Sequence, residues 1–298
     1  MSLTPTMFGQ IAAISTAVFW AFAVILFKKS GESVHPIGLN MFKNVFAIVL
    51  LIPTIYIFGD SLTGNFTWGE VALLLVSGAL GIGIADTLFF RSLNLLGAGL
   101  SAIVDCLYSP SIIILAFFWL GERLAFVQII GLLMILSAVL TITGADKKAP
   151  IPKKDLVWGI VWGVLAMFTM AFGIVMIKTL LNRSPLLPLS EIRLVGGAII
   201  LVIVLMFHPK RKSIIKPHLN RKDWGYLLVG SFIGTYISLV LWLAGMKYTQ
   251  TSLAAALNQT SNIFIFIFAA LFLKEPITRR RLFGIVMGFS GALIIVFA

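Results

Sequence analysis

Charged side chains are scarce in this sequence, and their scarcity excludes a soluble globular protein. Only 11% of the 298 residues are Asp, Glu, Lys or Arg, while 59% are hydrophobic. Soluble domains carry about 25% charged residues. The mean hydropathy is +1.04, and apolar runs long enough to cross a hydrocarbon layer of about 30 Å recur along the whole chain. We therefore expect an all-α polytopic protein that lies in a lipid bilayer, the cell (inner) membrane.

Cysteine and histidine are also rare. Cys106 is the single cysteine, so no disulfide can form within the chain. The three histidines, His35, His208 and His218, fall in connections between apolar runs, without a second ligand at a spacing typical of metal sites. The sequence contains no Walker-type phosphate loop. We therefore expect no metal, no cofactor and no ATP hydrolysis.

Acidic residues are outnumbered by basic ones. The chain has 11 acidic and 23 basic residues, which give a formal net charge of +12. Most of the cations lie in short connections between apolar runs, as they do in the cytoplasmic loops of membrane proteins. This placement argues against a nucleic-acid partner.

Ten apolar runs are expected to form transmembrane helices. They cover residues 7–27, 37–58, 69–90, 97–120, 124–143, 156–180, 189–207, 223–245, 251–273 and 281–297. The stretch "GADKKAPIPKKD" at 144–155 is rich in Pro and Lys and lies near the middle of the chain. It divides the chain into two five-helix units, residues 1–143 and 156–298, joined by a linker that we expect to be cytoplasmic.

The two units resemble each other at charged positions, which indicates an internal repeat. The matched pairs are Lys28 with Lys178 and Lys43 with Arg193 at an offset of 150, and Glu122 with Glu275 at an offset of 153. A repeat of five helices places its second copy in the opposite orientation, so we expect inverted repeats. The charge bias of the connections is likewise inverted between the halves. It predicts that both termini are extracytoplasmic.

Two segments carry a resemblance to a known family. They are "AGLSAIVDCLYSPSIIILAFFWLGERL" (98–124) and "TSLAAALNQTSNIFIFIFAALFLKEPI" (251–277), each followed by a last helix with spaced glycines. The chain resembles the EamA family of the drug/metabolite transporter superfamily, of the ten-helix type. The resemblance implies an exporter or permease for a small-molecule substrate, with a central cavity between the repeats. It does not imply which substrate, and the pair Asp86 and Asp105 is not part of the generic pattern.

Asp105 lies near the middle of an expected span, where a charge costs on the order of 2.5–3.5 kcal/mol. Ser101, Asp105, Tyr108 and Ser109 follow one another at helical spacing, which predicts a common face. At the offset of 153, polar residues recur in the second unit: Asn258 matches Asp105, Ser261 matches Tyr108 and Asn262 matches Ser109. We expect these six matched residues to bind substrate in a shared cavity. The alternative is that they join helices to each other.

Aromatic residues and further intramembrane charges complete the candidate site. Trp20, Tyr236 and Trp242 are expected to line an aromatic pocket, or else to pack as ordinary core residues.

Lys43 and Arg193 occupy equivalent places. They are candidates for gating and for binding a substrate carboxylate or neutralising Asp105, unless they reach toward the interface. Glu191 is close enough in sequence to pair with Arg193. Lys28 and Lys178, at helix ends, are expected to extend to the interface.

Asp86 and Pro110 are further candidates for gating or coupling. Asp86 is expected to serve as a gate or a proton carrier, or to lie at the interface near Arg91. Pro110 removes a backbone donor and frees the carbonyl of Cys106, which predicts a kink beside the cavity.

These features favour a secondary transporter that works by alternating access. We expect it to move a small metabolite, such as an amino acid or a related compound, in the direction of export. Protons are a candidate coupling ion, and facilitated diffusion is equally open. The alternatives are an integral membrane enzyme, a channel, or an importer of a vitamin- or nucleotide-type solute. The sequence does not indicate an oligomeric state.

Overall fold

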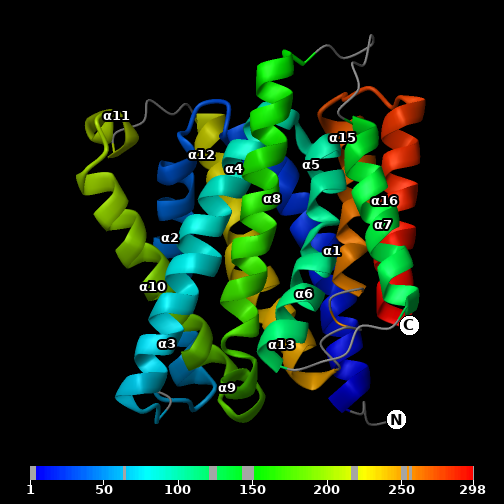
Figure 1. The fold of residues 1–298 in the computed structure, drawn as a ribbon. Coiled ribbons are helices and arrows are strands. Elements are labelled where there is room, and N and C mark those ends of the chain that lie inside the picture. Colours follow the sequence, from blue (N-terminus) through cyan, green and yellow to red (C-terminus); the bar gives the residue numbers. More distant parts are fainter. Residues whose placement is uncertain are drawn as a thin grey trace.

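The computed structural model describes residues 5–62, 65–120, 126–142, 151–215, 221–249, 254 and 257–297. Within these ranges the chain is helical, with no strand. The elements are α1 (Pro5–Ser30), α2 (Pro36–Ile57), α3 (Trp68–Gly78), η1 (Ala79–Ile84), α4 (Ala85–Leu96), α5 (Ala98–Asp105), α6 (Tyr108–Leu120), α7 (Phe126–Ile142), α8 (Lys153–Val175), α9 (Lys178–Arg183), α10 (Leu186–Met206), α11 (Arg211–Ile215), α12 (Arg221–Ser231), η2 (Phe232–Ile237), α13 (Ser238–Tyr248), α15 (Ser261–Phe272) and α16 (Arg279–Phe297). The helices run side by side as one bundle (Figure 1). The expected all-α fold is confirmed.

Seven helical stretches in the described part of the chain are long and apolar enough to cross a membrane. They are Pro5–Ser30, Pro36–Ile57, Trp68–Leu96, Ala98–Trp119, Lys153–Val175, Leu186–Met206 and Asp223–Tyr248. The other three expected spans overlap α7, α15 and α16, of which α15 covers only the second half of the span expected over 251–273. The protein is therefore a multi-pass membrane protein, and the number of ten spans stays a prediction.

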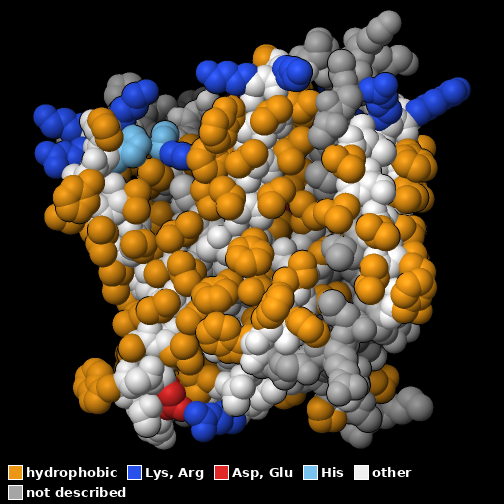
Figure 2. Space-filling model, viewed as in Figure 1, with side chains coloured by type: hydrophobic (Ala, Val, Ile, Leu, Met, Phe, Trp, Pro, Cys, Tyr) orange, Lys and Arg blue, Asp and Glu red, His pale blue; other side chains and the backbone are white. Residues whose placement is uncertain are grey.

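The outer surface of the bundle is apolar. Large side chains such as Val49, Phe118 and Leu133 are 57–79% exposed, and Figure 2 shows hydrophobic side chains across most of the visible face. Because lipid tails are as apolar as these side chains, such a surface is stable only inside a bilayer. The expected lipid-bilayer surroundings agree with this surface.

Basic residues gather at one end of the bundle, which we call the basic edge. Lys153 begins α8, Arg211 begins α11 and Arg279 begins α16, and all three starting points lie at the upper edge in Figure 1. Lys and Arg side chains gather along that edge in Figure 2, with a smaller charged group at the lower edge. Helix α1 begins and α16 ends toward the lower edge (Figure 1). Both ends of the described chain thus lie away from the basic edge.

Two π-helices interrupt long spans at matching places. η1 covers Ala79–Ile84 and η2 covers Phe232–Ile237, and each starts 153 positions from the other, the offset of the sequence repeat. A π-turn rotates the helix face that follows it, and π-turns are frequent at functional sites.

Glycine contacts bring helix α10 close to α3. A Cβ at Gly78 would lie 1.8 Å from the carbonyl oxygen of Arg193, and a Cβ at Gly196 would lie 2.2 Å from that of Leu75. Only glycine therefore allows the two backbones to cross at this distance, as is common where membrane helices pack tightly. This crossing carries the Arg193 side chain into the centre of the bundle.

The span expected over 97–120 is not one continuous helix. α5 ends at Asp105 and α6 begins at Tyr108, so Cys106 and Leu107 form a turn between them. Pro110 lies in the first turn of α6, where a missing N–H is tolerated. A similar turn at Thr260 precedes α15. Interrupted helices near the middle of the membrane are typical of transporter binding sites.

The matched lysines make matching contacts. Lys28 Nζ donates to the carbonyl of Asn94 at 3.2 Å, and Lys178 Nζ donates to that of Met246 at 2.8 Å. Each acceptor lies in the last turn of its helix, α4 or α13, where free carbonyl groups favour a cation. Both lysines are half-buried at helix ends, so the expectation that they extend to the interface stays a prediction.

Glu275 contacts the start of α5 from a segment 176 residues further along the chain. Its carboxylate accepts from the backbone N–H groups of Ala98 at 2.7 Å and Gly99 at 3.0 Å, and Arg281 Nη1 lies 3.2 Å away. This caps a helix N-terminus with a negative charge. Its sequence match, Glu122, lies outside the described residues.

Candidate functional site

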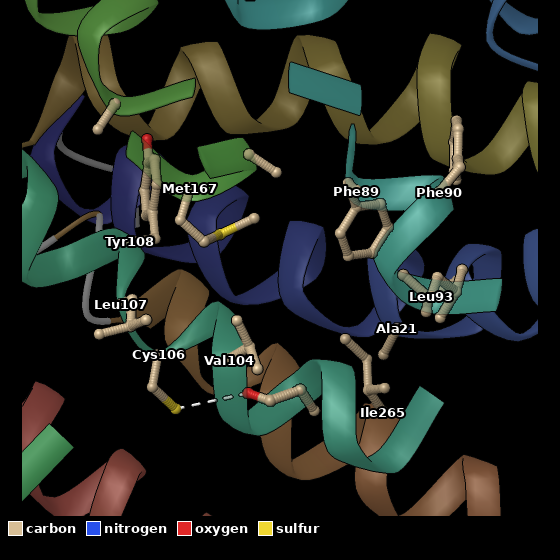
Figure 3. Close-up of a cluster of buried hydrophobic side chains, with 14 of the residues drawn as sticks. Ala21, Phe89, Phe90, Leu93, Val104, Cys106, Leu107, Tyr108, Met167 and Ile265 are labelled. Atoms are coloured by element: carbon tan, nitrogen blue, oxygen red, sulfur yellow. Dashed lines mark hydrogen bonds between the residues drawn. The ribbon is translucent and has the colours of Figure 1, made fainter. Parts of the chain in front are cut away.

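A central cavity of about 130 Å³ opens between helices from both halves of the chain. This volume is enough for several water molecules or for part of a small metabolite. Its polar wall consists of Thr16, Lys43, Asp86, Asp105, Tyr108, Arg193, Thr235, Ser238, Asn258, Gln259, Ser261 and Asn262. Its apolar wall includes Trp20, Phe89, Met167, Met170 and Trp242. Figure 3 shows Phe89, Tyr108 and Met167 among the side chains of the hydrophobic core beside it.

Lys43 and Asp86 form a buried ion pair at the cavity wall. Lys43 Nζ lies 2.6 Å from Asp86 Oδ2, and the two side chains are 3% and 10% exposed. Lys43 Nζ also donates to Asn44 Oδ1 at 3.2 Å. The interfacial alternative for Asp86 is therefore wrong, because α2 presents Lys43 to it. Arg91 instead stacks over Trp162, with 5.4 Å between the guanidinium carbon and the ring centroid.

Asn40 holds the π-helix beside this ion pair. Its amide Nδ2 donates to the carbonyl groups of Ile82 at 3.0 Å and Gly83 at 2.8 Å, and to Thr87 Oγ1 at 2.9 Å. Asn44 Nδ2 donates in turn to Asn40 Oδ1 at 3.3 Å. Asn40, Lys43 and Asn44 therefore share one face of α2.

Arg193 is the second buried cation at the cavity. Its Nε donates to Ser77 Oγ at 3.0 Å, and its guanidinium carbon lies 5.8 Å from the centroid of Trp242. Its Nη1 is buried and has no hydrogen-bond partner in the structure. The expected local pair with Glu191 is wrong, because the guanidinium points to α3 instead. Arg193 therefore keeps free donor capacity.

Asp105 brings a carboxylate to the same cavity from the end of α5. The residue is 8% exposed, and no hydrogen bond or ion pair to its carboxylate is present in the described part of the chain. Gln259 Nε2 donates to the backbone carbonyl of Asp105 at 3.4 Å. No direct bond joins Asp105 to Asn258, and Asn258 Oδ1 has no partner. The geometry does not support the alternative in which these two residues hold helices together by bonding each other.

The structure brings most of the predicted site residues together. Those on the cavity wall are Asp105, Tyr108, Asn258, Ser261, Asn262, Trp20, Trp242, Asp86, Lys43 and Arg193. Asn262 Nδ2 donates to Gln259 Oε1 and, at 3.4 Å, to Cys106 Sγ. Gln259 was not predicted, although it follows Asn258 directly in the sequence and stands in the same polar stripe.

Three predicted residues lie off the cavity wall. Ser109 is buried behind it with an unpartnered hydroxyl, because the turn at Cys106 and Leu107 changes the helix face. Pro110 lies in the first turn of α6, just after the turn at Cys106 and Leu107, and does not line the cavity. The Tyr236 hydroxyl lies 2.6 Å from Thr54 Oγ1 and its ring stacks on Phe232.

Tyr236 points away from the cavity because it lies in the π-helix η2. The π-turn places Thr235 and Ser238 on the cavity wall instead. A prediction based on 3.6 residues per turn cannot find these two residues, since a π-helix has a different period.

A multi-pass helical membrane protein with buried charges around a central cavity has the architecture of a membrane carrier. The chain belongs to the EamA-like transporter family, whose model matches residues 7–144 and 157–297. The predicted family resemblance is thereby confirmed.

Named relatives are transporters as well. An uncharacterized transporter of Archaeoglobus fulgidus is 25% identical over 279 residues, 92% of this chain and 93% of that protein. The riboflavin transporter of Vibrio cholerae is 29% identical over 139 residues, 45% of each chain. A solved crystal structure covers 96% of this chain and 95% of its own, with a TM-score of 0.72 and 17% identity, and shows the same fold.

Proposed function

We propose that this protein is a secondary transporter that exports a small zwitterionic metabolite, of the amino-acid class, by alternating access. The observation that carries the proposal is the pair of opposite charges left without an ionic partner at the cavity. Lys43 and Asp86 neutralise each other, whereas no salt bridge in the described part of the chain involves Arg193 or Asp105. A ligand that bears both a carboxylate and an ammonium group complements these two.

The energetic reason is the low polarity of the site. A buried charge without a counter-charge is strongly unfavourable, so Arg193 and Asp105 gain most from a ligand that neutralises both. A guanidinium binds a carboxylate through parallel N–H donors, and Arg193 Nη1 has a donor to spare. Tyr108 and Asn258 each place an unpartnered polar atom nearby.

The apolar wall favours a substrate with an apolar side chain. Trp20, Phe89 and Trp242 provide flat surfaces, and Met167 and Met170 provide flexible ones. A zwitterion with a hydrophobic side chain therefore fits both walls better than a sugar or a polyanion does.

Alternating access has a structural basis in the interruptions of the spans. The π-helices η1 and η2 and the turns before α6 and α15 all adjoin the cavity. Positive residues concentrate at the basic edge, which supports a cytoplasmic position for that edge and an extracytoplasmic one for both termini. Helices from both halves would then move about a site near the middle of the membrane.

Counterflow in proteoliposomes tests the proposal. The purified protein would be reconstituted and loaded with unlabelled L-leucine, and entry of labelled L-leucine would be measured. We expect saturable exchange that isobutylamine and 4-methylpentanoate, which each carry one charged group, inhibit at least tenfold less well than L-leucine. Flux that rises linearly without counterflow would indicate a channel and overturn the proposal.

A vitamin importer is the second candidate. The observation that favours it is the named riboflavin transporter of Vibrio cholerae, which matches 45% of this chain. A panel of amino acids, nucleosides and riboflavin in the same counterflow assay separates the two. Exchange of riboflavin but of no amino acid would replace the zwitterion proposal with this one.

A further inference from the structure

Glu191 is a buried acidic residue that does not line the cavity. It lies in α10, is 5% exposed, and its Oε2 has no hydrogen-bond partner in the structure. It is absent from the residues that line the cavity. Acidic groups inside a membrane span are rare and mark ion or proton pathways.

The position of Glu191 relates it to the cavity. Leu187, Glu191 and Leu194 follow at intervals of four and three residues, so they share one face of α10. Leu187 and Leu194 pack with Ala47 and Leu51 of α2. Leu194 also lines the cavity. Glu191 therefore lies about one turn from the cavity wall, between α10 and its neighbours.

The depth of Glu191 in the bundle follows from its position along α10. α10 begins at Leu186 toward the lower edge, opposite the basic edge (Figure 1). Five residues at about 1.5 Å each place Glu191 some 7–8 Å inside, and Leu194 lies about 4.5 Å deeper. Glu191 thus separates the cavity from the edge that we propose to be extracytoplasmic.

No counter-charge faces Glu191 from the elements packed on α10, which are α2, η1, α3 and α13. Most charged and titratable groups of these elements and of the adjoining α4 and η2 have other partners: Lys43 pairs with Asp86, Glu70 with Arg183, Tyr236 with Thr54, and Lys247 with the Ser184 carbonyl. Arg91 stacks over Trp162 and Tyr248 lies against Lys247, while Tyr56 is exposed at the end of α2. Arg193, on α10 itself, points to Ser77. Unlike Asp105, Glu191 does not line the cavity, where a ligand can supply a counter-charge. An ionised Glu191 would be an uncompensated charge, so this buried position favours the carboxylic acid.

We propose that Glu191 is the proton-carrying residue of a substrate–proton antiport. In the conformation seen here Glu191 is a neutral acid, with its proton taken from the extracytoplasmic side. When the protein opens to the cytoplasm, water reaches the carboxyl group and the proton leaves, which creates the carboxylate. Entry of one proton in this way drives export of the substrate against its gradient. This inference rests on the proposed transport function.

Two measurements test it. Infrared difference spectroscopy of the substrate-free protein at neutral pH reports protonated carboxylic acids directly. We expect a carbonyl band that Glu191→Gln removes and that Asp105→Asn leaves in place. The absence of any band specific to Glu191 would overturn the proposal, whether or not the protein transports leucine.

The second measurement separates proton coupling from substrate binding. In proteoliposomes with L-leucine, Glu191→Gln should lower accumulation driven by a pH gradient at least tenfold, while leucine counterflow stays within about twofold of the wild type. Glu191→Asp, which keeps the acid, should retain coupling. Equal loss of both activities in Glu191→Gln, or retention of both, would overturn the role of Glu191. If the wild type shows no counterflow, the proposed function fails, and the infrared result still decides the protonation of Glu191.

Discussion

Lys43 Nζ lies 2.6 Å from Asp86 Oδ2, so a cation of α2 and an anion of α4 neutralise each other beside the cavity. The pair places no net charge in the membrane, and it leaves the other two charged groups of the wall, Arg193 and Asp105, for a ligand. The division of four charges into one internal pair and one open pair is the basis of the proposed selectivity for zwitterions.

Removal of one partner of the Lys43–Asp86 pair should destabilise the protein. Asp86→Asn leaves a buried ammonium without a counter-charge, a change that costs on the order of 3–5 kcal/mol when a buried pair is broken. Thermal unfolding in detergent should show a lower midpoint for Asp86→Asn than for the double variant Lys43→Met/Asp86→Asn, which has no charge left. Equal midpoints for the wild type and Asp86→Asn would contradict the pairing.

Asp105 is expected to act on substrate and not on folding. Asp105→Asn keeps the size of the side chain and removes its charge, so transport should fall at least tenfold, about 1.4 kcal/mol, at normal expression. Ser109→Ala is the matched control, because Ser109 is buried two helix positions beyond the turn and off the cavity wall. It should transport within about twofold of the wild type. Normal flux in Asp105→Asn would assign that carboxylate a structural role only.

Cysteine labelling tests the cavity in the second unit. In a Cys106→Ser background, Asn262→Cys should react with a small membrane-impermeant thiol reagent, since Asn262 lines the cavity. Saturating L-leucine should slow the reaction. Ile265→Cys, at a buried position of the same helix that does not line the cavity, should react far more slowly. An active Asn262→Cys protein that is neither labelled nor protected would place the site elsewhere.

The orientation of the bundle is a separate prediction. A reporter that fluoresces only in the cytoplasm should be dark when fused after Ala298 and bright when inserted between residues 146 and 154. The reason is the excess of Lys and Arg at the basic edge. The reverse pattern would show that the charge bias does not orient this protein.

His35 should make the stability of the protein depend on pH. Its Nδ1 accepts from the backbone N–H of Ile37 at 3.3 Å, so it must stay unprotonated to cap α2. Burial, followed by the nearby His208, Arg91 and Lys210, lowers the pKa of His35 below its ordinary value of 6.5. The folded state thus resists protonation, and its stability is kept above about pH 6.5 and declines as the pH falls from there toward the lowered pKa.

The change His35→Asn checks this explanation. Asn caps helices without titrating, so the unfolding midpoint of this variant should fall less between pH 7.5 and 5.5 than that of the wild type. An equal fall in both proteins would assign the pH dependence to other groups.

The sequence by itself determined the membrane class, the helical fold and the polar stripe of the cavity. The length and apolarity of each run decide where a helix can cross a bilayer, because hydrophobicity sums locally along the chain. The repeat then matched Asp105 with Asn258 and Ser261 with Tyr108, and all four side chains line the cavity.

Only the tertiary structure decided which side chains pair. Arg193 bonds Ser77 and not the nearby Glu191 because Gly78 lets α10 approach α3 backbone to backbone. Tyr236 turns away from the cavity because the π-helix η2 changes the helical period. Pairing depends on the distance and rotation between helices remote in sequence, and these are set by close packing of whole surfaces. These distances and rotations cannot be predicted from a local sequence pattern.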